Sequence, residues 1–442
     1  MYGVCGEMSH RFHKIQKIDF PLLAEGFLLQ GGTMKRLLLM SVLIISFSCA
    51  YAADSLQTMF SEGSARGEIR VLDFSRDFDG STDTRRDDAV GGLFYFKTAP
   101  LYGISFGVGF ATVNDMFSDE DDAVYGILKK GDDGDHESMT RLQEAYIQGE
   151  WFKTTVKYGA QEISTPFLDR HDLRMIPRSY KGLSVVNNSV NGLTASAYYI
   201  TDSMGWTDDD FISMSDAVAA EPGGASSIDD EKPMIIGGLS YVLPVQSFKS
   251  TAQGWFYTMP DVFRETYFKV SLSKTFGDFT LFSAPSLLYQ KSQGDELNGE
   301  LDTDQVGLNA GVSAYGVTFT GFYAKTGDDT LLAPWGDDKA IIQQVLAAGR
   351  AEEDAYAAKL AYDFTKVGVK GLSAYVFYGQ YDVPASTGKD MSETDYNIQY
   401  AFSGKLDGIG LRARYASIEI DGGEDYTDTR FYVTYKFAFN GK

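Results

Sequence analysis

From residue 64 onward, the chain alternates apolar or aromatic side chains with small, polar or charged ones in segments of about ten residues. The last segment is a clear case, because Phe431, Val433 and Tyr435 alternate with Tyr432, Thr434 and Lys436. A period of two puts the two sets on opposite faces of a β-strand. Each strand therefore meets an apolar medium on one face and water on the other, and the sequence predicts an all-β chain.

The alternation predicts eighteen strands. They are expected at 65–75, 89–98, 103–113, 142–149, 152–162, 182–190, 193–202, 234–244, 250–258, 263–275, 278–290, 303–312, 315–325, 354–364, 370–381, 392–402, 408–420 and 428–439. Tight turns and long acidic or polar loops alternate between them. An even strand number with short turns at one end and long loops at the other is typical of an outer-membrane β-barrel. Such a barrel would be surrounded by outer-membrane lipid and lipopolysaccharide, and the aromatic last strand suits the barrel insertion machinery.

Composition excludes several other classes of protein. The mean hydropathy of −0.19 and the absence of a long apolar stretch in the sequence exclude a helical multispan membrane protein. The net charge of −22 argues against nucleic acid as a partner. A soluble β-sandwich is the structural alternative, but it would carry mixed loops at both ends and bury its apolar faces between two sheets.

The N-terminal region is interpreted as an export signal. Met34-Lys35-Arg36 precedes the apolar run 37–47, which ends near Ala50-Tyr51-Ala52. A basic start, a short apolar run and an A-x-A site define a secretory signal peptide. We therefore predict that residues 1–33 are a mis-assigned upstream extension, 34–52 the signal peptide and 53–442 the barrel. Peptides from residues 1–33 in the native precursor would contradict this division.

One stretch resembles a known family. Residues 142–159 (LQEAYIQGEWFKTTVKYG), then 165–168 (TPFL) and 172–182 (DLRMIPRSYKG), are similar to the OprD family of outer-membrane porins, in which a strand pair leads into a loop with a D-x-R-x-x-P core. The resemblance implies a substrate-specific channel for small solutes, often amino acids or other carboxylates. It also implies that the loop containing Arg174 folds inward and narrows the pore.

The residues of this loop agree with that expectation in part. Segment 163–181 is rich in charge and is stiffened by Pro166 and Pro177. In a constriction, guanidinium groups that face carboxylates would create a transverse field across the water-filled pore. The candidate constriction residues are Arg170, Asp172, Arg174 and Arg178. A solvated loop with internal ion pairs is the alternative.

Basic residues on the polar strand faces form a second candidate site. Arg412 and Arg414 alternate with apolar neighbours, so both point into the lumen if the other face meets lipid, where an arginine would cost about 2–4 kcal/mol at the midplane. Lys436, with Lys153 and Lys157 on the strand expected at 152–162, would extend a row of positive charge. The row resembles the basic ladder of OprD-type pores, which binds carboxylates.

Other segments leave alternatives open. Asp337-Asp338 followed by 339–349 predicts a short amphipathic helix, either a second wall of the mouth or a loop filler. Acidic runs at 77–83, 119–122, 132–135 and 208–210 suggest calcium, but the first lacks the glycine and glutamate of a calcium loop. An enzyme is disfavoured, because His136 and His171 are the only histidines after residue 52 and neither has a recognisable nucleophile.

The sequence thus favours an eighteen-stranded outer-membrane porin with an inward-folded constriction loop, without cofactor or metal, that conducts small charged solutes passively. A general diffusion porin without a binding site and a plugged receptor or adhesin barrel remain alternatives. Monomers and homotrimers are both compatible with the sequence.

Overall fold

A computed structural model describes residues 53–118, 123–124, 126–131, 136–221, 224, 228, 230–332 and 335–440. The expected signal peptide, the extension before it and the acidic runs 119–122 and 132–135 lie outside these residues, so the division of the N-terminal region stays a prediction. None of the helices in the described part is long and apolar enough to cross a membrane.

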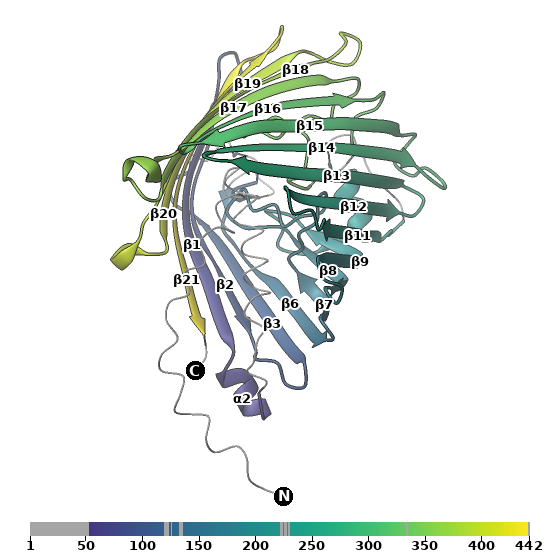
Figure 1. The fold of residues 1–442 in the computed structure, drawn as a ribbon, viewed down its shortest axis with the longest axis vertical. Helices are drawn as coiled ribbons and strands as arrows, with labels where there is room; N and C mark the ends of the chain where they lie inside the picture. The colour runs from purple at the N-terminus through teal and green to yellow at the C-terminus, as the bar shows by residue number, and fades with distance from the viewer. Residues whose placement is uncertain are drawn as a thin grey trace, which may run out of the picture. The chain divides into compact units, whose positions relative to one another are not determined.

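Eighteen antiparallel strands form one closed barrel, as the alternation predicts (Figure 1). They are β1 (Ser64–Phe78), β2 (Arg85–Lys97), β3 (Ile104–Asp115), β6 (Met139–Trp151), β7 (Thr154–Gln161), β8 (Ser179–Asn187), β9 (Leu193–Met204), β11 (Met234–Val242), β12 (Lys249–Met259), β13 (Phe263–Phe276), β14 (Phe279–Ser292), β15 (Asp302–Ala314), β16 (Val317–Thr326), β17 (Asp354–Asp363), β18 (Leu372–Asp382), β19 (Met391–Ala401), β20 (Ile409–Ile420) and β21 (Tyr426–Asn440).

Short elements occupy the connections. Strands β4 (Lys129–Lys130), β5 (His136–Glu137) and β10 (Ile212–Ser213) lie in the long loops. The helices of the described chain are α2 (Leu56–Ser61), α3 (Met214–Ala219) and the 3-10 turns η1 (Phe364–Val367) and η2 (Gly404–Leu406).

The first and last strands close the barrel. β1 pairs with β21 in an unbroken antiparallel register from Ser64 opposite Asn440 to Phe78 opposite Tyr426. Figure 1 shows the purple first strand beside the yellow last strand. Closure gives every strand two neighbours, so no edge exposes unpaired backbone groups to the hydrocarbon.

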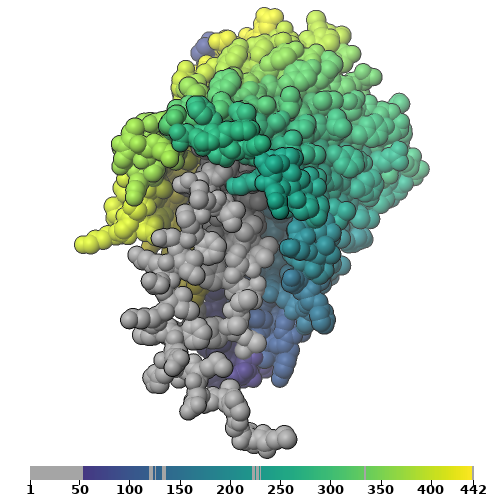
Figure 2. Space-filling view, in the orientation of Figure 1, coloured from purple at the N-terminus to yellow at the C-terminus, as the bar shows by residue number. Residues whose placement is uncertain are grey.

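The outer face of the barrel is apolar, as the period of two predicts. Phe431, Val433 and Tyr435 on β21 are 54%, 47% and 44% exposed, whereas Asp428 and Arg430 on the opposite face are buried. Similar outward rows cover the other strands, and in Figure 2 the side chains of the green strands form a continuous outer surface. In a membrane this face meets lipid, which explains why so many large apolar side chains are exposed.

The predicted helix over 339–349 is wrong. Residues 341–348 form no helix, and an isolated bridge pairs Ile342 with Ala347 instead. The reason is tertiary: backbone N–H groups of this segment donate to carboxylates of β19 rather than to carbonyls one helical turn earlier. Those partners, Glu393 and Asp395, lie about fifty residues later in the sequence, so the residues around 340 do not reveal them.

Candidate functional site

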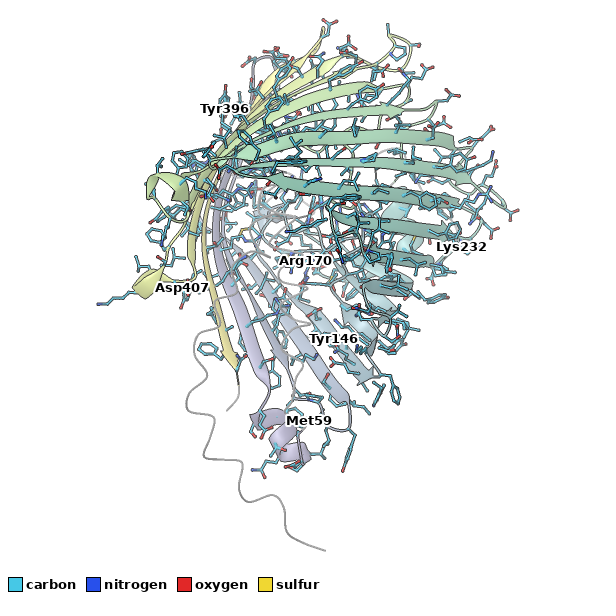
Figure 3. The ribbon with its side chains drawn as sticks, in the orientation of Figure 1. Met59, Tyr146, Arg170, Lys232, Tyr396 and Asp407 are labelled. Carbon is cyan, nitrogen blue, oxygen red and sulfur yellow. The ribbon has the colours of Figure 1, made fainter. Side chains whose placement is uncertain are left out.

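Two long loops contact the inner face of the barrel far from their own strands. The first inserted loop is residues 162–178, between β7 and β8, and the second is residues 327–353, between β16 and β17, described except for 333–334. Both are held by inward-facing side chains of distant strands. In Figure 3 Arg170, from the first inserted loop, lies within the outline of the barrel, whereas Met59 lies beside α2 at one end.

The first inserted loop is anchored to strands on both sides. The Arg70 guanidinium on β1 contacts the Asp172 carboxylate at 2.9 Å and also donates to the carbonyl of Arg174. On the other side, the Tyr257 hydroxyl of β12 accepts from the backbone N–H of Phe167 at 3.2 Å, and the Phe167 ring packs edge-on against Tyr267 of β13. Strands β1 and β13 are far apart around the barrel, so the loop between them lies inside it.

Three of the four charged residues expected to face the pore are engaged in ion pairs within the protein, both inside the loop and to neighbouring segments. Arg170 pairs with Glu162 and Asp172 at 3.0 Å each. Arg178 pairs with Glu221 at 3.1 Å and lies over the rings of Trp206 and Trp335. Asp172 also binds Arg70. Arg170, Asp172 and Arg178 are therefore ion-paired, as in the alternative to the constriction, but their side chains are largely buried and not solvated.

Arg174 has different surroundings from the other three. Its guanidinium lies over the rings of Phe74 and Trp206, at 5.4 and 5.0 Å. Burial and the neighbouring Arg430 guanidinium lower the pKa of Arg174 to about 9, so that it is charged at neutral pH. Arg174 therefore brings the first inserted loop close to the basic wall of β20 and β21.

The two inserted loops meet at His171. Its Nδ1 lies 2.9 Å from Asp337 Oδ1, its ring stacks on Trp206, and its carbonyl accepts from the Trp206 indole. Asp337, not the adjacent Asp172, is therefore the carboxylate partner of His171. Burial lowers the pKa of His171, so the imidazole is neutral at pH 7.

Apolar packing fills one side of the barrel interior. Phe167 and Leu168 of the first inserted loop, Met214 and Val218 of α3, and Trp335 of the second inserted loop belong to one buried cluster. The same cluster takes in Tyr257, Met259, Tyr267 and Leu288 from the walls β12 to β14. Water and charged solutes are excluded there, and smaller buried apolar clusters also lie on the opposite wall, around Phe74 of β1 and Phe377 of β18. An aqueous path is therefore expected along the charged, inward-facing part of that opposite wall, β17 to β21.

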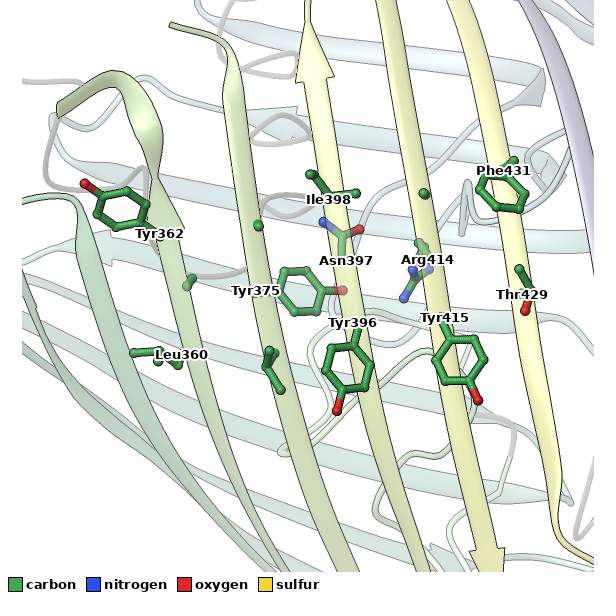
Figure 4. Close-up of a pocket in the computed structure, with 14 residues that line it drawn as sticks. Leu360, Tyr362, Tyr375, Tyr396, Asn397, Ile398, Arg414, Tyr415, Thr429 and Phe431 are labelled. Atoms are coloured by element: carbon green, nitrogen blue, oxygen red, sulfur yellow. The ribbon is translucent and has the colours of Figure 1, made fainter. Parts of the chain in front are cut away.

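Positive charge collects on that opposite wall. Arg412 and Arg414 on β20 point inward, as predicted, because their neighbours Leu411 and Tyr415 are exposed on the outer face. Lys359 of β17 lies with its Nζ 3.8 Å from the centre of the Tyr375 ring. Tyr375, Asn397 and Arg414 lie side by side on neighbouring strands (Figure 4).

Three of these cations lack a carboxylate partner. Within the described chain, no Asp or Glu oxygen lies within 4.0 Å of Lys359, Arg412 or Arg414. The Arg412 Nε donates to the amide oxygen of Asn397 at 2.7 Å, and the Arg414 Nε is buried without a hydrogen-bond partner. In contrast, Arg430 is paired with Asp428 at 2.6 Å. Among the described residues, these three cations of the wall therefore have no direct carboxylate partner.

The remaining predicted basic residues differ in position. Lys157 on β7 points inward, and its Nζ lies 4.2 Å from the centre of the Tyr146 ring. Lys436 pairs with Glu68 at 3.3 Å. Lys153 does not lie on the strand expected at 152–162, which is wrong at its start: the residue occupies the tight turn before β7, with a positive φ of 57°, and is exposed. Turn geometry displaces it from the row.

Sequence reasoning missed Lys359, Tyr375 and Arg430. All three sit at inward positions of strands whose alternation was recognised, so the same parity argument that found Arg412 and Arg414 identifies them. The alternation of inward and outward positions does not show which inward charges are paired. That depends on registers between strands and on the inserted loops.

A cavity of about 530 Å³ adjoins this wall on its outer side. Outward-facing Leu360, Tyr396, Ile398, Tyr415 and Phe431 line it, so it opens toward lipid and not toward the lumen (Figure 4). The cavity is therefore separate from the basic wall, although Arg414 and Asn397 contribute to its floor.

The family model for the outer membrane porins of the OprD family matches residues 59–439. The chain belongs to the OprD family. It is accordingly an outer-membrane protein whose family and barrel fold are those of channels. No curated protein sequence matches the chain.

Several solved structures of the OprD-type barrel are similar to this chain. OpdK from Pseudomonas aeruginosa, solved with vanillate, is 21% identical, with a TM-score of 0.77 over 86% of this chain and 100% of its own. OccK9 (OpdG) from Pseudomonas aeruginosa is 22% identical, with a TM-score of 0.78 over the same shares. A BenF-like porin from Pseudomonas fluorescens is 17% identical, with a TM-score of 0.77 over 86% and 100%. At these identities, the likeness to the three structures establishes the fold alone.

Proposed function

We propose that this OprD family member is a substrate-selective channel for small anionic solutes, with organic carboxylates and the carboxylate end of amino acids as the preferred class. The two inserted loops form the constriction in this proposal. The solute passes this constriction and then contacts the inward-facing cations of β17 and β20, which are Lys359, Arg412 and Arg414.

The observation that carries the proposal is the unneutralised charge of Lys359, Arg412 and Arg414. A permeating carboxylate can accept two parallel hydrogen bonds from one guanidinium group, in a bidentate pair. Water in the lumen keeps each contact weak enough to release the solute, as conduction requires. The overall charge of −22 favours the opposite ion, so anion preference would have to come from this local wall.

Planar-bilayer recording tests the proposal. In a KCl gradient, the reversal potential of the wild-type channel is expected to indicate Cl⁻ preference, and a small carboxylate is expected to reduce the current saturably. The double variant Arg412→Gln with Arg414→Gln, and separately Lys359→Gln, should shift the reversal potential toward K⁺ and weaken the block.

The matched control is Lys153→Gln, which removes one positive charge from an exposed turn outside the lumen. It should leave selectivity unchanged. A general diffusion porin would show a linear current without saturable block, and a plugged receptor would show no conductance. An unchanged reversal potential in both lumen variants would contradict the assignment of these three cations to the path.

A further inference from the structure

Two buried carboxylates lie on the same wall as the unpaired cations. Glu393 and Asp395 point inward from β19 and are 0% and 1% exposed, while the outward Tyr396 beside them is 50% exposed. In the described chain, neither carboxylate has a Lys, Arg or His nitrogen within 4.0 Å. Asp395 stands two residues from Asn397, whose register partner on β20 is Arg414. Unless they are masked, these negative charges would offset the positive wall.

Backbone amides of the second inserted loop cover both carboxylates. The N–H groups of Val345 and Leu346 donate to the two oxygens of Glu393, at 2.9 and 2.6 Å. The N–H of Gln344 donates to Asp395 at 3.2 Å. Three successive backbone N–H groups thus point at two carboxyl groups, which is the arrangement that a backbone nest provides for a bound anion.

The covering segment is a small closed unit. The N–H of Ala348 donates to the carbonyl of Ile341 at 3.1 Å, so its two ends are adjacent. The Gln343 side chain donates to the carbonyl of Phe377 at 2.9 Å and accepts from the Tyr381 hydroxyl at 2.9 Å. Gln344 donates to Asp428 on β21 at 2.6 Å. The segment therefore bridges β18, β19 and β21 across the inner wall.

We propose that residues 341–348 are an electrostatic shield: they mask Glu393 and Asp395 from the lumen, so that the wall presents Lys359 and Arg414 to the solute without their negative neighbours. This inference rests on the proposed anion path. Because the same hydrogen bonds hold the segment against the inner wall and cover the carboxylates, pore width and charge selectivity are coupled. Release of the segment widens the pore and reduces its anion preference together.

Deletion of residues 341–348 in the full-length chain tests the shield. Because the two ends of the segment are adjacent, the remaining chain can be joined across a short distance. In planar bilayers with a KCl gradient, the deletion is expected to raise conductance and to shift the reversal potential toward K⁺. The same deletion combined with Glu393→Gln and Asp395→Asn is expected to raise conductance equally but to keep the reversal potential of the wild type. Equal shifts in both backgrounds, or no shift in either, would overturn the shield.

A substitution that inserts a bulky side chain beside the segment, called the wedge variant, tests the shield if the deletion variant does not assemble into the membrane. A Cβ at Gly379 on β18 would lie 2.1 Å from the Gln343 side-chain oxygen. Gly379→Leu should therefore displace the Gln343 side chain and break its hydrogen bonds to Phe377 and Tyr381, which loosens the segment without changing charge or chain length. Its control is Gly321→Leu, where the nearest atom to a Cβ is 4.0 Å away. The wedge should shift the reversal potential toward K⁺, and the control should not.

These experiments separate the two proposals. A wild-type channel without Cl⁻ preference contradicts the anion path itself. A wild-type channel with Cl⁻ preference whose selectivity survives both the deletion and the wedge supports the path and removes the shield.

Discussion

At the scale of single residues, the lumen shows paired and unpaired charges side by side. Asp428 on β21 accepts from Arg430 at 2.6 Å, from Arg76 at 2.8 Å and from Gln344 at 2.6 Å, and it is fully buried. Arg430 is 1% exposed and stacks over Phe74. A buried guanidinium of this kind depends on its counter-charge, whereas no carboxylate in the described part of the chain lies within 4.0 Å of Arg412 or Arg414.

Asp428→Asn is expected to destabilise the barrel strongly. The variant leaves Arg430 buried without its carboxylate, which costs on the order of 3 kcal/mol in the free energy of unfolding. Urea unfolding of the detergent-solubilised protein measures this loss. The control Asp354→Asn breaks the exposed pair of Asp354 with Lys325, and the urea concentration at the midpoint of its unfolding should equal that of the wild type. Equal stability of the two variants would contradict the role of Asp428.

Asp169 gives a prediction about pH. Burial, and the nearby Asp337, raise the pKa of Asp169 from 3.8 to about 7 in the folded state. A raised carboxyl pKa means that the protonated form is favoured by folding, so its stabilising contribution is complete below pH 3.8 and is lost as pH rises through about 7.

Asp169→Asn should therefore raise the temperature of unfolding at pH 8 and leave it nearly unchanged at pH 4. The amide keeps an acceptor for the Ser164 hydroxyl or the His171 N–H, both of which bind Asp169 in the wild type. Asp83→Asn, in an exposed loop, is the control. The prediction fails if Asp169→Asn lowers the unfolding temperature at pH 8.

At the scale of elements, glycine permits the strand geometry that leads into the first inserted loop. Gly159 on β7 and Gly182 on β8 face each other in register and have positive φ angles of 128° and 156°. A Cβ at Gly159 would lie 2.3 Å from the carbonyl oxygen of Ala145 on the neighbouring strand. Both the backbone conformation and the close approach exclude a side chain there.

Gly159→Ala is expected to destabilise the barrel by about 1–3 kcal/mol, because the alanine must adopt a strained φ against the β6 backbone. Gly237→Ala on β11 is the matched control, since a Cβ at that strand position meets nothing within 4 Å. Urea unfolding in detergent compares the two. A larger loss for Gly237→Ala than for Gly159→Ala would show that strand glycines matter here for another reason.

The inserted loops also show where sequence prediction stops at this scale. All eighteen strands were predicted with ends that differ by only a few residues, whereas the helix over 339–349 was wrong and α3 was not anticipated. The periodicity of a strand is a property of consecutive residues, so it can be recognised in the sequence. The conformation of 341–348 depends on Glu393 and Asp395, which lie some fifty residues later.

At the scale of the whole molecule, two charge distributions oppose each other. The chain as a whole is acidic, with a net charge of −22, but the inner wall of β17 to β20 carries unneutralised Lys359, Arg412 and Arg414. Charges within a narrow, loop-lined lumen act on a solute at short range. The acidic exterior acts at distances that salt screens.

Anion preference should consequently depend on salt. Between 0.1 M and 1 M KCl, at which the screening length falls from about 10 Å to about 3 Å, the Cl⁻ preference is expected to weaken as the fixed lumen charges are screened. Reversal potentials at a constant concentration ratio measure this. The double variant Arg412→Gln with Arg414→Gln should show a smaller salt dependence than the wild type, and an identical dependence would place the selective charges elsewhere.

The sequence by itself determined the strands, their inward and outward faces and the inward direction of Arg412 and Arg414, because a period of two is a local property of consecutive residues. Only the tertiary structure decided which charges are paired. Asp172 binds Arg70, which lies more than a hundred residues away in the chain. His171 binds Asp337, although Asp172 is the residue next to His171 in the sequence. Such pairings depend on how the closed barrel brings distant loops and strands to one interior, and no local pattern encodes that geometry.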